Sequence, residues 1–174
     1  MIRRTFLRRT YSRPGELAAD LRSLRRAGSA ARSGPRSAVA VDFRERLMLV
    51  VTEVNGCRYC SWFHSGSALT AGIPLPELGE LLRGRLPQDT PAEQFPALVY
   101  AHQWAERDGR PTAEMDTALF GQYGEAQGRA ILDLLRMIRI GNLLGNSFDL
   151  ALFRLSFGLL GLRRDEARYT RPAA

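Results

Sequence analysis

Both cysteines and one of the two histidines of this chain stand close together, as Cys57, Cys60 and His64. Residues three and four positions apart lie on the same face of a helix, so these side chains are expected to form a single column. Two thiols at this spacing fall within the Cα separation that a disulfide bridges. The imidazole beside them is a base that takes a thiol proton near neutral pH. The column therefore predicts a redox or nucleophilic site.

The chemistry of such a pair depends on which thiol ionises. A free thiol is mostly protonated at neutral pH, and the first turn of a helix or a neighbouring imidazolium lowers its pKa. Position at the helix start favours Cys57 as the more acidic thiol. A thiolate that attacks a peroxide oxygen becomes a sulfenic acid, which the neighbouring cysteine converts to a disulfide. The pair therefore supports a complete peroxidase half-cycle.

Two helices must position this column. Asn55-Gly56, directly before the first cysteine, predicts a break between one helix over residues 38–54 and another over 57–71. We expect these two helices to form an antiparallel hairpin. The first of them carries an apolar stripe at helical spacing, formed by Phe43, Leu47, Val50, Val51 and Val54.

The hairpin brings a carboxylate to the histidine. Residues equally distant from the turn lie side by side, which places Glu45 beside His64. On one straight helix Glu45 would lie about 18 Å from Cys57, at 1.5 Å per residue. We expect Glu45 to orient and charge the imidazole of His64, which takes the proton of Cys60. Glu53 lies nearer the turn, opposite Cys57, and is a second candidate carboxylate.

The run from Glu45 to His64, ERLMLVVTEVNGCRYCSWFH, resembles the core of the alkylhydroperoxidase D-like branch of the carboxymuconolactone decarboxylase family. Redox members of that family have a glutamate, a Cys-x-x-Cys twelve residues later and a histidine four residues beyond the second cysteine. Glu45, Cys57, Cys60 and His64 match these positions in residue type and spacing. The helix pattern extends the resemblance over roughly residues 38–148.

The resemblance implies an all-α fold that assembles as trimers, hexamers or other rings. It also implies that Cys60 is the peroxidatic cysteine and Cys57 the resolving one, and that a dithiol or lipoyl-type donor supplies the electrons. One position departs from the pattern, because Tyr59 stands where the prototype peroxidase has a second histidine. Tyr59 is therefore a further candidate site residue, and the proton relay is expected to differ.

The rest of the chain has no period-two strand pattern, internal repeat or glycine-rich phosphate loop, so we predict an all-α domain. Thr90 begins a capping box that predicts a helix start at residue 91, and Gly145-Asn146 predicts a break before the last helix. Beyond the hairpin, the expected helices cover residues 14–27, 76–83, 91–107, 112–123, 125–144 and 147–160.

Several large side chains are expected to pack rather than to react. His102 lies on an apolar stripe, which predicts a core histidine, and Trp62, Phe63 and Trp104 are predicted packing residues that could also wall a peroxide pocket. The last helix has more apolar surface than one small domain needs, which favours an oligomer interface. Its apolar residues are Phe148, Phe153, Phe157, Leu159 and Leu160.

The charge is concentrated at the N-terminus. All 25 positive residues are arginine, and ten of them lie in the first 36 residues, against Glu16 and Asp20. The rest of the chain carries 15 positive and 16 negative residues, so a nucleic-acid-binding protein is not indicated. We predict a basic arm over 1–36, an all-α domain over 37–162 and a tail over 163–174. Within the arm, residues 1–13 are expected to be mobile and residues 28–37 to form a Gly/Ser/Pro linker, and the arm as a whole is expected to be a solvated or partner-docking segment.

Zinc is the main alternative for a Cys-x-x-Cys with a nearby histidine. Only His102 remains as a further histidine, and there is no second cysteine pair, so a closed tetrahedral site is poorly supplied. We therefore predict no metal, and we also predict no bound cofactor. Stable membrane insertion is not expected either, because no apolar run approaches the roughly 18 residues of a span. A cysteine pair of this kind indicates an intracellular redox role, and we expect a cytoplasmic protein.

The sequence thus predicts an oligomeric thiol peroxidase that reduces hydroperoxides through a Cys57–Cys60 disulfide. Two other functions stay open. One is a redox sensor or interaction subunit that uses the same disulfide as a switch. The other is a lyase or isomerase like the decarboxylase branch, whose members as a rule lack the cysteine pair.

Overall fold

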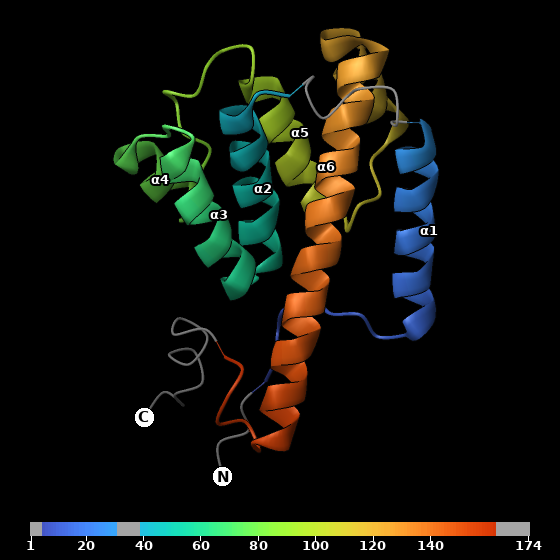
Figure 1. The fold of residues 1–174 in the computed structure, drawn as a ribbon, viewed down its shortest axis with the longest axis vertical. Helices are drawn as coiled ribbons and strands as arrows, with labels where there is room; N and C mark the ends of the chain where they lie inside the picture. The colour runs from blue at the N-terminus through green and yellow to red at the C-terminus, as the bar shows by residue number, and fades with distance from the viewer. Residues whose placement is uncertain (1–4, 31–38, 163–174) are drawn as a thin grey trace.

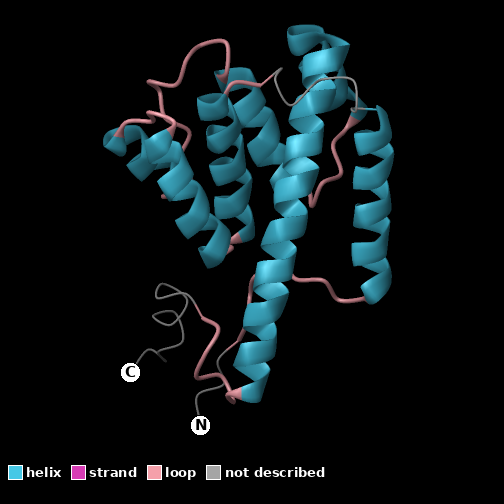
Figure 2. Cartoon of the chain, viewed as in Figure 1, coloured by secondary structure: helices cyan, strands magenta, loops and turns pink. Residues whose placement is uncertain are grey.

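The computed structural model describes residues 5–30 and 39–162, and every regular element within them is a helix (Figure 2). The predicted all-α class is therefore confirmed. The chain order is α1 (Pro14–Ala30), α2 (Val41–Asn55), α3 (Arg58–Thr70), α4 (Leu75–Leu81), α5 (Phe95–Glu106) and α6 (Ala113–Leu155).

Helix α2 is the centre of the fold. It packs against α3, α4, α5 and α6 (Figure 1), so its side chains are buried on almost every side. Of the predicted stripe only Val54 is half-exposed, and the other four residues are buried. Glu45 and Thr52 are buried as well, so the polar groups of α2 must find their partners inside the protein.

The predicted break at Asn55-Gly56 occurs, with Gly56 as the C-cap of α2. Its φ of 74° is left-handed, a conformation that glycine adopts without a Cβ penalty, and its N–H bonds the Thr52 carbonyl at 2.7 Å. The next residue, Cys57, is extended and is the N-cap of α3. One glycine thus ends the first helix, and the first cysteine begins the second.

Helix α6 is the longest element and runs along the long axis, between α1 and the cluster formed by α2 to α5 (Figure 1). Thr112 caps it as predicted, by accepting a hydrogen bond from the Met115 N–H at 3.3 Å. Gly124 interrupts it with a φ of 69°. The predicted break at Gly145-Asn146 is wrong, because the helix continues to Leu155.

The predicted capping box at Thr90 is also wrong. Its hydroxyl donates to Glu77 Oε1 at 3.4 Å instead of capping a helix, and α5 begins only at Phe95. Glu77 is buried and is paired with the equally buried guanidinium of Arg46 (Nε–Oε1 2.6 Å). The Thr90 side chain therefore belongs to a tertiary polar cluster and does not cap the helix that the local pattern predicted.

Three of the expected packing residues lie elsewhere than predicted. His102 is not in the core, since its side chain is about one-third exposed and lies 3.6 Å from the Glu106 carboxylate. Trp62 is 81% exposed and Phe63 is exposed too, so neither is buried in the core. Trp104 is buried, as predicted.

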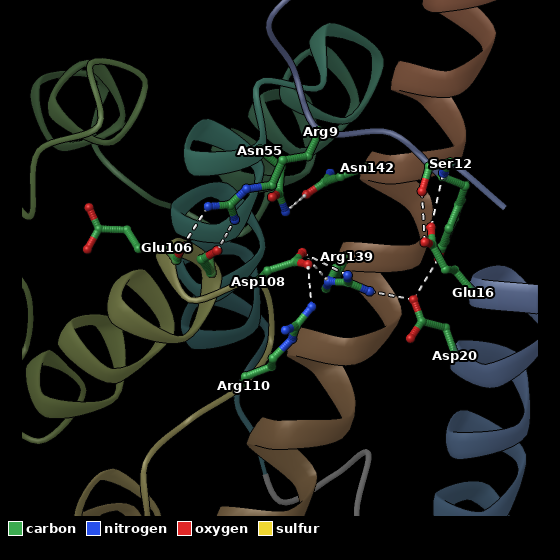
Figure 3. Close-up of polar contacts among 12 residues, drawn as sticks. Arg9, Ser12, Glu16, Asp20, Asn55, Glu106, Asp108, Arg110, Arg139 and Asn142 are labelled. Atoms are coloured by element: carbon green, nitrogen blue, oxygen red, sulfur yellow. Dashed lines mark hydrogen bonds and ion pairs between the residues drawn. The ribbon is translucent and has the colours of Figure 1, made fainter.

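The basic arm is packed against the domain in its described part. Phe6 contacts Phe153 at a ring distance of 5.9 Å, and the backbone N–H of Tyr11 bonds Ser147 Oγ at 3.0 Å. Helix α1 lies against α6, where Arg139 binds both Asp20 and Asp108 (Figure 3). The described residues of the arm thus make defined contacts with the domain instead of lying free in solvent.

Parts of three expectations fall outside the described residues. They are the start of the arm, most of the linker predicted over 28–37, and the tail from residue 163. Helix α1 does continue through Ala30, into the first residues assigned to that linker. Within the described ranges, no helix combines the length and the apolar character that crossing a membrane requires.

Candidate functional site

The two cysteines lie together where α3 begins. Their Sγ atoms are 2.7 Å apart, and both thiols are free. Cys57 is fully buried, whereas Cys60 is partly exposed. The pair needs only a small approach to reach the roughly 2.05 Å of a disulfide bond, so a dithiol–disulfide cycle requires no rearrangement of the helix.

Helix α6 passes closely behind the thiols at two glycines one turn apart. A Cβ on Gly145 would lie 2.8 Å from Cys57 Sγ and 3.3 Å from the Tyr59 ring, and one on Gly141 would lie 4.0 Å from Cys60 Sγ. No side chain fits at position 145, so this position of the helix requires glycine. This close approach accounts for the glycine at position 145, whereas the sequence interpreted it as a helix end; α6 continues through it to Leu155.

The acidity of the two thiols differs in direction. A hydrogen bond from Cys60 lowers the pKa of Cys57 to about 7, although burial opposes the shift. The Cys60 backbone N–H adds a hydrogen bond to Cys57 Sγ at 3.3 Å, at the positive end of α3. The pKa of Cys60 is raised, first by its hydrogen bond to the Cys57 sulfur and then by burial. In the reduced protein the thiolate therefore resides on Cys57, as its position at the helix start predicted.

The structure brings Glu45 and His64 together. Nδ1 of His64 lies 2.7 Å from Oε2 of Glu45, a carboxylate that is almost completely buried. Burial alone would raise the pKa of Glu45, but hydrogen bonds from His64 and Arg44 hold it below its ordinary value. An ionised carboxylate only accepts, so the nitrogen that faces it, Nδ1, carries the proton, and Nε2 is the nitrogen that does not face Glu45.

Arg44 is a site residue that sequence reasoning missed. Its guanidinium bonds Oε1 of Glu45 at 3.0 Å, and so leaves Oε2 for the histidine. The carboxylate is thus fixed from both sides. Its position next to Glu45 in the sequence carried no signal, because adjacent residues on a helix do not face each other.

Cys60 and His64 line the same pocket, whose volume is about 320 Å³. The walls are apolar, with Met48, Phe63 and Met137 among them, and the ring of Phe63 meets the imidazole edge-on at 5.1 Å. A pocket of this kind admits a small organic molecule to the Cys60 thiol. Phe63 thus walls the pocket, one of the two roles that the sequence allowed for it.

The two secondary candidates are engaged in other contacts. The Tyr59 hydroxyl donates to Asp149 Oδ1 at 2.7 Å, and burial followed by this bond raises its pKa. Tyr59 is therefore a neutral phenol whose proton points away from the pocket that its ring lines. Glu53 accepts a hydrogen bond from Ser61 Oγ at 2.7 Å, which ties α2 to α3.

A buried amide network lies beside the thiols, between α2 and α6. Asn55 donates to Asn142 Oδ1 at 3.2 Å (Figure 3), and Asn142 donates to Thr52 Oγ1 at 3.1 Å. Asn146 donates to the Asn55 carbonyl at 2.8 Å, and so satisfies the end of α2. A hydrogen bond from Asn142 to Cys60 also counteracts part of the rise in that thiol's pKa.

Asp149 is the most unusual residue of the site, and sequence reasoning did not single it out. It is fully buried, and its carboxylate binds Arg8 and Arg58 at 2.7 Å each as well as the Tyr59 hydroxyl. Arg8 belongs to the arm, whereas Arg58 and Tyr59 separate the two cysteines. No local pattern relates residues so distant in sequence.

Metal binding has little support among the side chains that the structure describes. No group of three histidine, cysteine, aspartate or glutamate residues is placed to hold an ion there.

Compared with protein-family models, with curated proteins and with solved structures, the chain finds no match. The chemistry of the site must therefore be argued from its own geometry.

Proposed function

We propose that this protein is a thiol-dependent peroxidase that reduces hydroperoxides through a Cys57–Cys60 disulfide cycle. One observation carries the proposal. The two thiols are 2.7 Å apart, Cys60 lines a pocket together with His64, and a buried Glu45 orients that histidine. A nucleophile, a resolving thiol and an oriented base are the groups that the reaction needs.

The reaction proceeds in three balanced steps. A thiolate attacks one oxygen of the hydroperoxide, so that an S–O bond forms, the O–O bond breaks and the alkoxide leaves as an alcohol after taking a proton. The second thiol then attacks the sulfenic sulfur, which forms the disulfide and releases water. A dithiol donor finally returns two electrons and two protons, and is itself oxidised to a disulfide.

Acidity and access favour different cysteines for the first step. The thiolate of the resting pair lies on Cys57, but this residue is fully buried, and only Cys60 lines the pocket. A proton crosses the 2.7 Å between the sulfurs readily, whereas a hydroperoxide cannot reach a buried atom. We therefore assign the attack to Cys60 and the resolution to Cys57.

His64 acts as the proton carrier in this scheme. It follows Cys60 by one helical turn, and Glu45 holds its Nδ1–H, which leaves Nε2 to take the thiol proton. The same proton is then available for the departing alkoxide. Glu45 and Arg44 are positioning residues, because they hold the histidine in the required tautomer without touching the reacting atoms.

The remaining parts of the proposal follow the family resemblance. The electron donor is a dithiol or lipoyl-type carrier, and the protein works as a homo-oligomer such as a trimer or hexamer. A Cys-x-x-Cys pair that must be re-reduced in every cycle suits the reducing cytoplasm. The function needs neither a metal nor a bound cofactor.

The test is the loss of free thiol, followed by stopped flow after mixing the reduced protein with an organic hydroperoxide. A peroxidase loses both thiols rapidly, and turns over when a dithiol donor is added. Slow oxidation that stops after one equivalent would contradict the proposal and favour the redox-sensor alternative.

Single cysteine variants test the two roles. We expect Cys60→Ser to abolish peroxide consumption, because the only thiol in the pocket is lost. Cys57→Ser should leave a sulfenic acid on Cys60 that a dimedone probe traps, since no resolving thiol remains. Trapping in Cys60→Ser but not in Cys57→Ser would reverse the assignment.

A further inference from the structure

Arg8, a residue of the N-terminal arm, lies inside the protein beside the turn that precedes the cysteines. Its side chain is only 5% exposed. Nη1 donates to Asp149 Oδ2 at 2.7 Å and to Asn146 Oδ1 at 3.1 Å, and reaches the Gly56 carbonyl at 3.5 Å. Nη2 donates to the Gly161 carbonyl. One guanidinium thus joins the α2–α3 turn to α6 and to the chain that follows it.

The arm is held in place on both sides of Arg8. Phe6 packs on Phe153, and the Arg8 guanidinium lies over the Phe6 ring at 4.6 Å. On the other side, the N–H of Tyr11 bonds Ser147 Oγ at 3.0 Å. Arg8 is therefore positioned by the packing of its neighbours and does not depend on its ion pair alone.

Arg8 shares its carboxylate with a second guanidinium. Asp149 lies between the guanidinium groups of Arg8 and Arg58 and binds both. The third partner of this carboxylate, Tyr59, is neutral. These groups lie in a largely buried place, where each charge acts strongly on its neighbours.

We propose that Arg8 is a positioning residue of the thiol site, which fixes the turn at the start of α3 and stabilises the thiolate of the Cys57–Cys60 pair. The use of this thiolate in catalysis rests on the proposed function. The effect on the thiolate itself does not, since it is present in the reduced protein before any peroxide is added.

The ionisation of Cys57 agrees with this role. Its pKa is lowered first by the hydrogen bond from Cys60, then by backbone N–H groups of α3, and also by the charge of Arg8. Among the described residues, Arg58 on α3 and Asp149 on α6 also carry charge near the turn. Removing Arg8 would take one positive charge away from the thiolate, so the thiolate would lose part of its stabilisation.

The experiment varies the charge of this cluster and reads the thiolate directly, by its absorbance at 240 nm against pH. Arg8→Gln removes one positive charge from the cluster, and we expect the first thiol pKa to rise by at least about half a unit, a threefold loss of thiolate. Asp149→Asn removes one negative charge and should lower the first thiol pKa. The double variant restores the original net charge and should return close to the wild type.

A purely structural role predicts another order. Loss of the Arg8–Asp149 contact would then change the pKa in the same direction in both single variants, and the double variant would not recover. That result would overturn the proposal. If Arg8→Gln does not fold, as judged by circular dichroism, Asp149→Asn decides alone, and an unchanged or raised pKa sinks the idea.

Two controls separate charge from position. Arg9→Gln removes the same charge from the next residue, whose guanidinium donates to the Ala105 and Glu106 carbonyls at the end of α5 (Figure 3), so the thiol pKa should not change. Arg8→Lys keeps the charge and should keep the pKa. If the thiolate responds as expected but peroxide is not consumed, the peroxidase function fails while the role of Arg8 stands.

Discussion

At the scale of single residues, the site depends on two short contacts that act in sequence. The 2.7 Å contact between the thiols lets one proton be shared, which keeps Cys57 ionised near neutral pH. The 2.7 Å contact between Glu45 and His64 provides the base that takes this proton away. A thiolate at the pocket requires both contacts. Cys57, Cys60, His64 and Glu45 are therefore expected to act as one unit.

The histidine–glutamate contact makes a prediction about coupling. We expect His64→Ala to slow peroxide consumption roughly a hundredfold, the usual contribution of a general base, and Glu45→Gln to slow it less. The double variant should be no slower than His64→Ala, because Glu45 acts only through the histidine. Second-order rate constants from stopped flow measure these effects.

Glu53→Gln is the matched control for this series. It is another carboxylate of α2, and it accepts a hydrogen bond from Ser61. Its rate should stay near that of the wild type. Additive losses in the double variant, or a larger effect from Glu53→Gln than from Glu45→Gln, would show that the relay runs elsewhere.

The acidity of Cys57 makes a prediction about pH. With a pKa of about 7, the thiolate fraction rises about tenfold between pH 6 and pH 8, since the charged form is the deprotonated one. Absorbance at 240 nm should follow this rise in the wild type. In Cys57→Ser the remaining thiol should titrate well above pH 8, and a transition that stays near pH 7 would assign the acidic thiol to Cys60.

At the scale of elements, α6 has glycines at the two positions where it passes close to the thiols. Gly141 and Gly145 weaken a helix by about 1 kcal/mol each relative to alanine, yet they stand in its second half, against the thiols. Asn146 follows them, and its side chain caps the end of α2 and receives Arg8. The two glycines thus lower the helix propensity of α6, and they allow its buried polar face to lie close to the cysteines.

This arrangement predicts opposite effects for two substitutions on one helix. Gly145→Ala places a Cβ 2.8 Å from Cys57 Sγ, so we expect it to lower the free energy of unfolding by about 1–3 kcal/mol despite the better helix former. Gly121→Ala has no atom within 4 Å and should raise that free energy by about 0.5–1 kcal/mol. Urea unfolding measures both, and stabilisation by Gly145→Ala would contradict the close approach.

At the scale of the whole molecule, the chain leaves a large apolar surface around the end of α6. Leu155 and Phe157 are 79% and 97% exposed, and Phe148, Leu159 and Leu160 are exposed as well. Surfaces of this kind are rare on monomers and are common at subunit interfaces. Four of these residues were predicted to form an interface, Leu155 is an addition, and the fifth predicted residue, Phe153, packs on Phe6 instead. We expect self-association at this surface.

Sedimentation velocity tests this expectation. We expect the wild type to sediment as an oligomer, and Leu155→Glu with Phe157→Glu to shift it to the monomer, because a buried unpaired charge is costly. Leu75→Glu is the control, since Leu75 is 71% exposed but lies at the start of α4. A monomeric wild type, or dissociation by Leu75→Glu alone, would place the interface elsewhere or exclude it.

The features that the sequence determined by itself depend on neighbours along the chain. The glycine at residue 56 ends a helix through its own left-handed backbone, and Thr112 caps one through a bond to Met115. The spacing of Cys60 and His64 places both on one side of α3, whereas Cys57 caps this helix, and counting back from the turn predicted that Glu45 meets the histidine. All of these follow from helix geometry and one short connection.

Only the tertiary structure decided the rest, because it depends on groups far apart in sequence. Thr90 binds Glu77 rather than capping a helix, and Gly145-Asn146 stays helical because it faces the cysteines and the end of α2, 91 positions from Asn55. Arg8 enters the site through Asp149, 141 positions away. Local patterns state what a segment prefers, whereas burial against a distant partner decides whether that preference is realised.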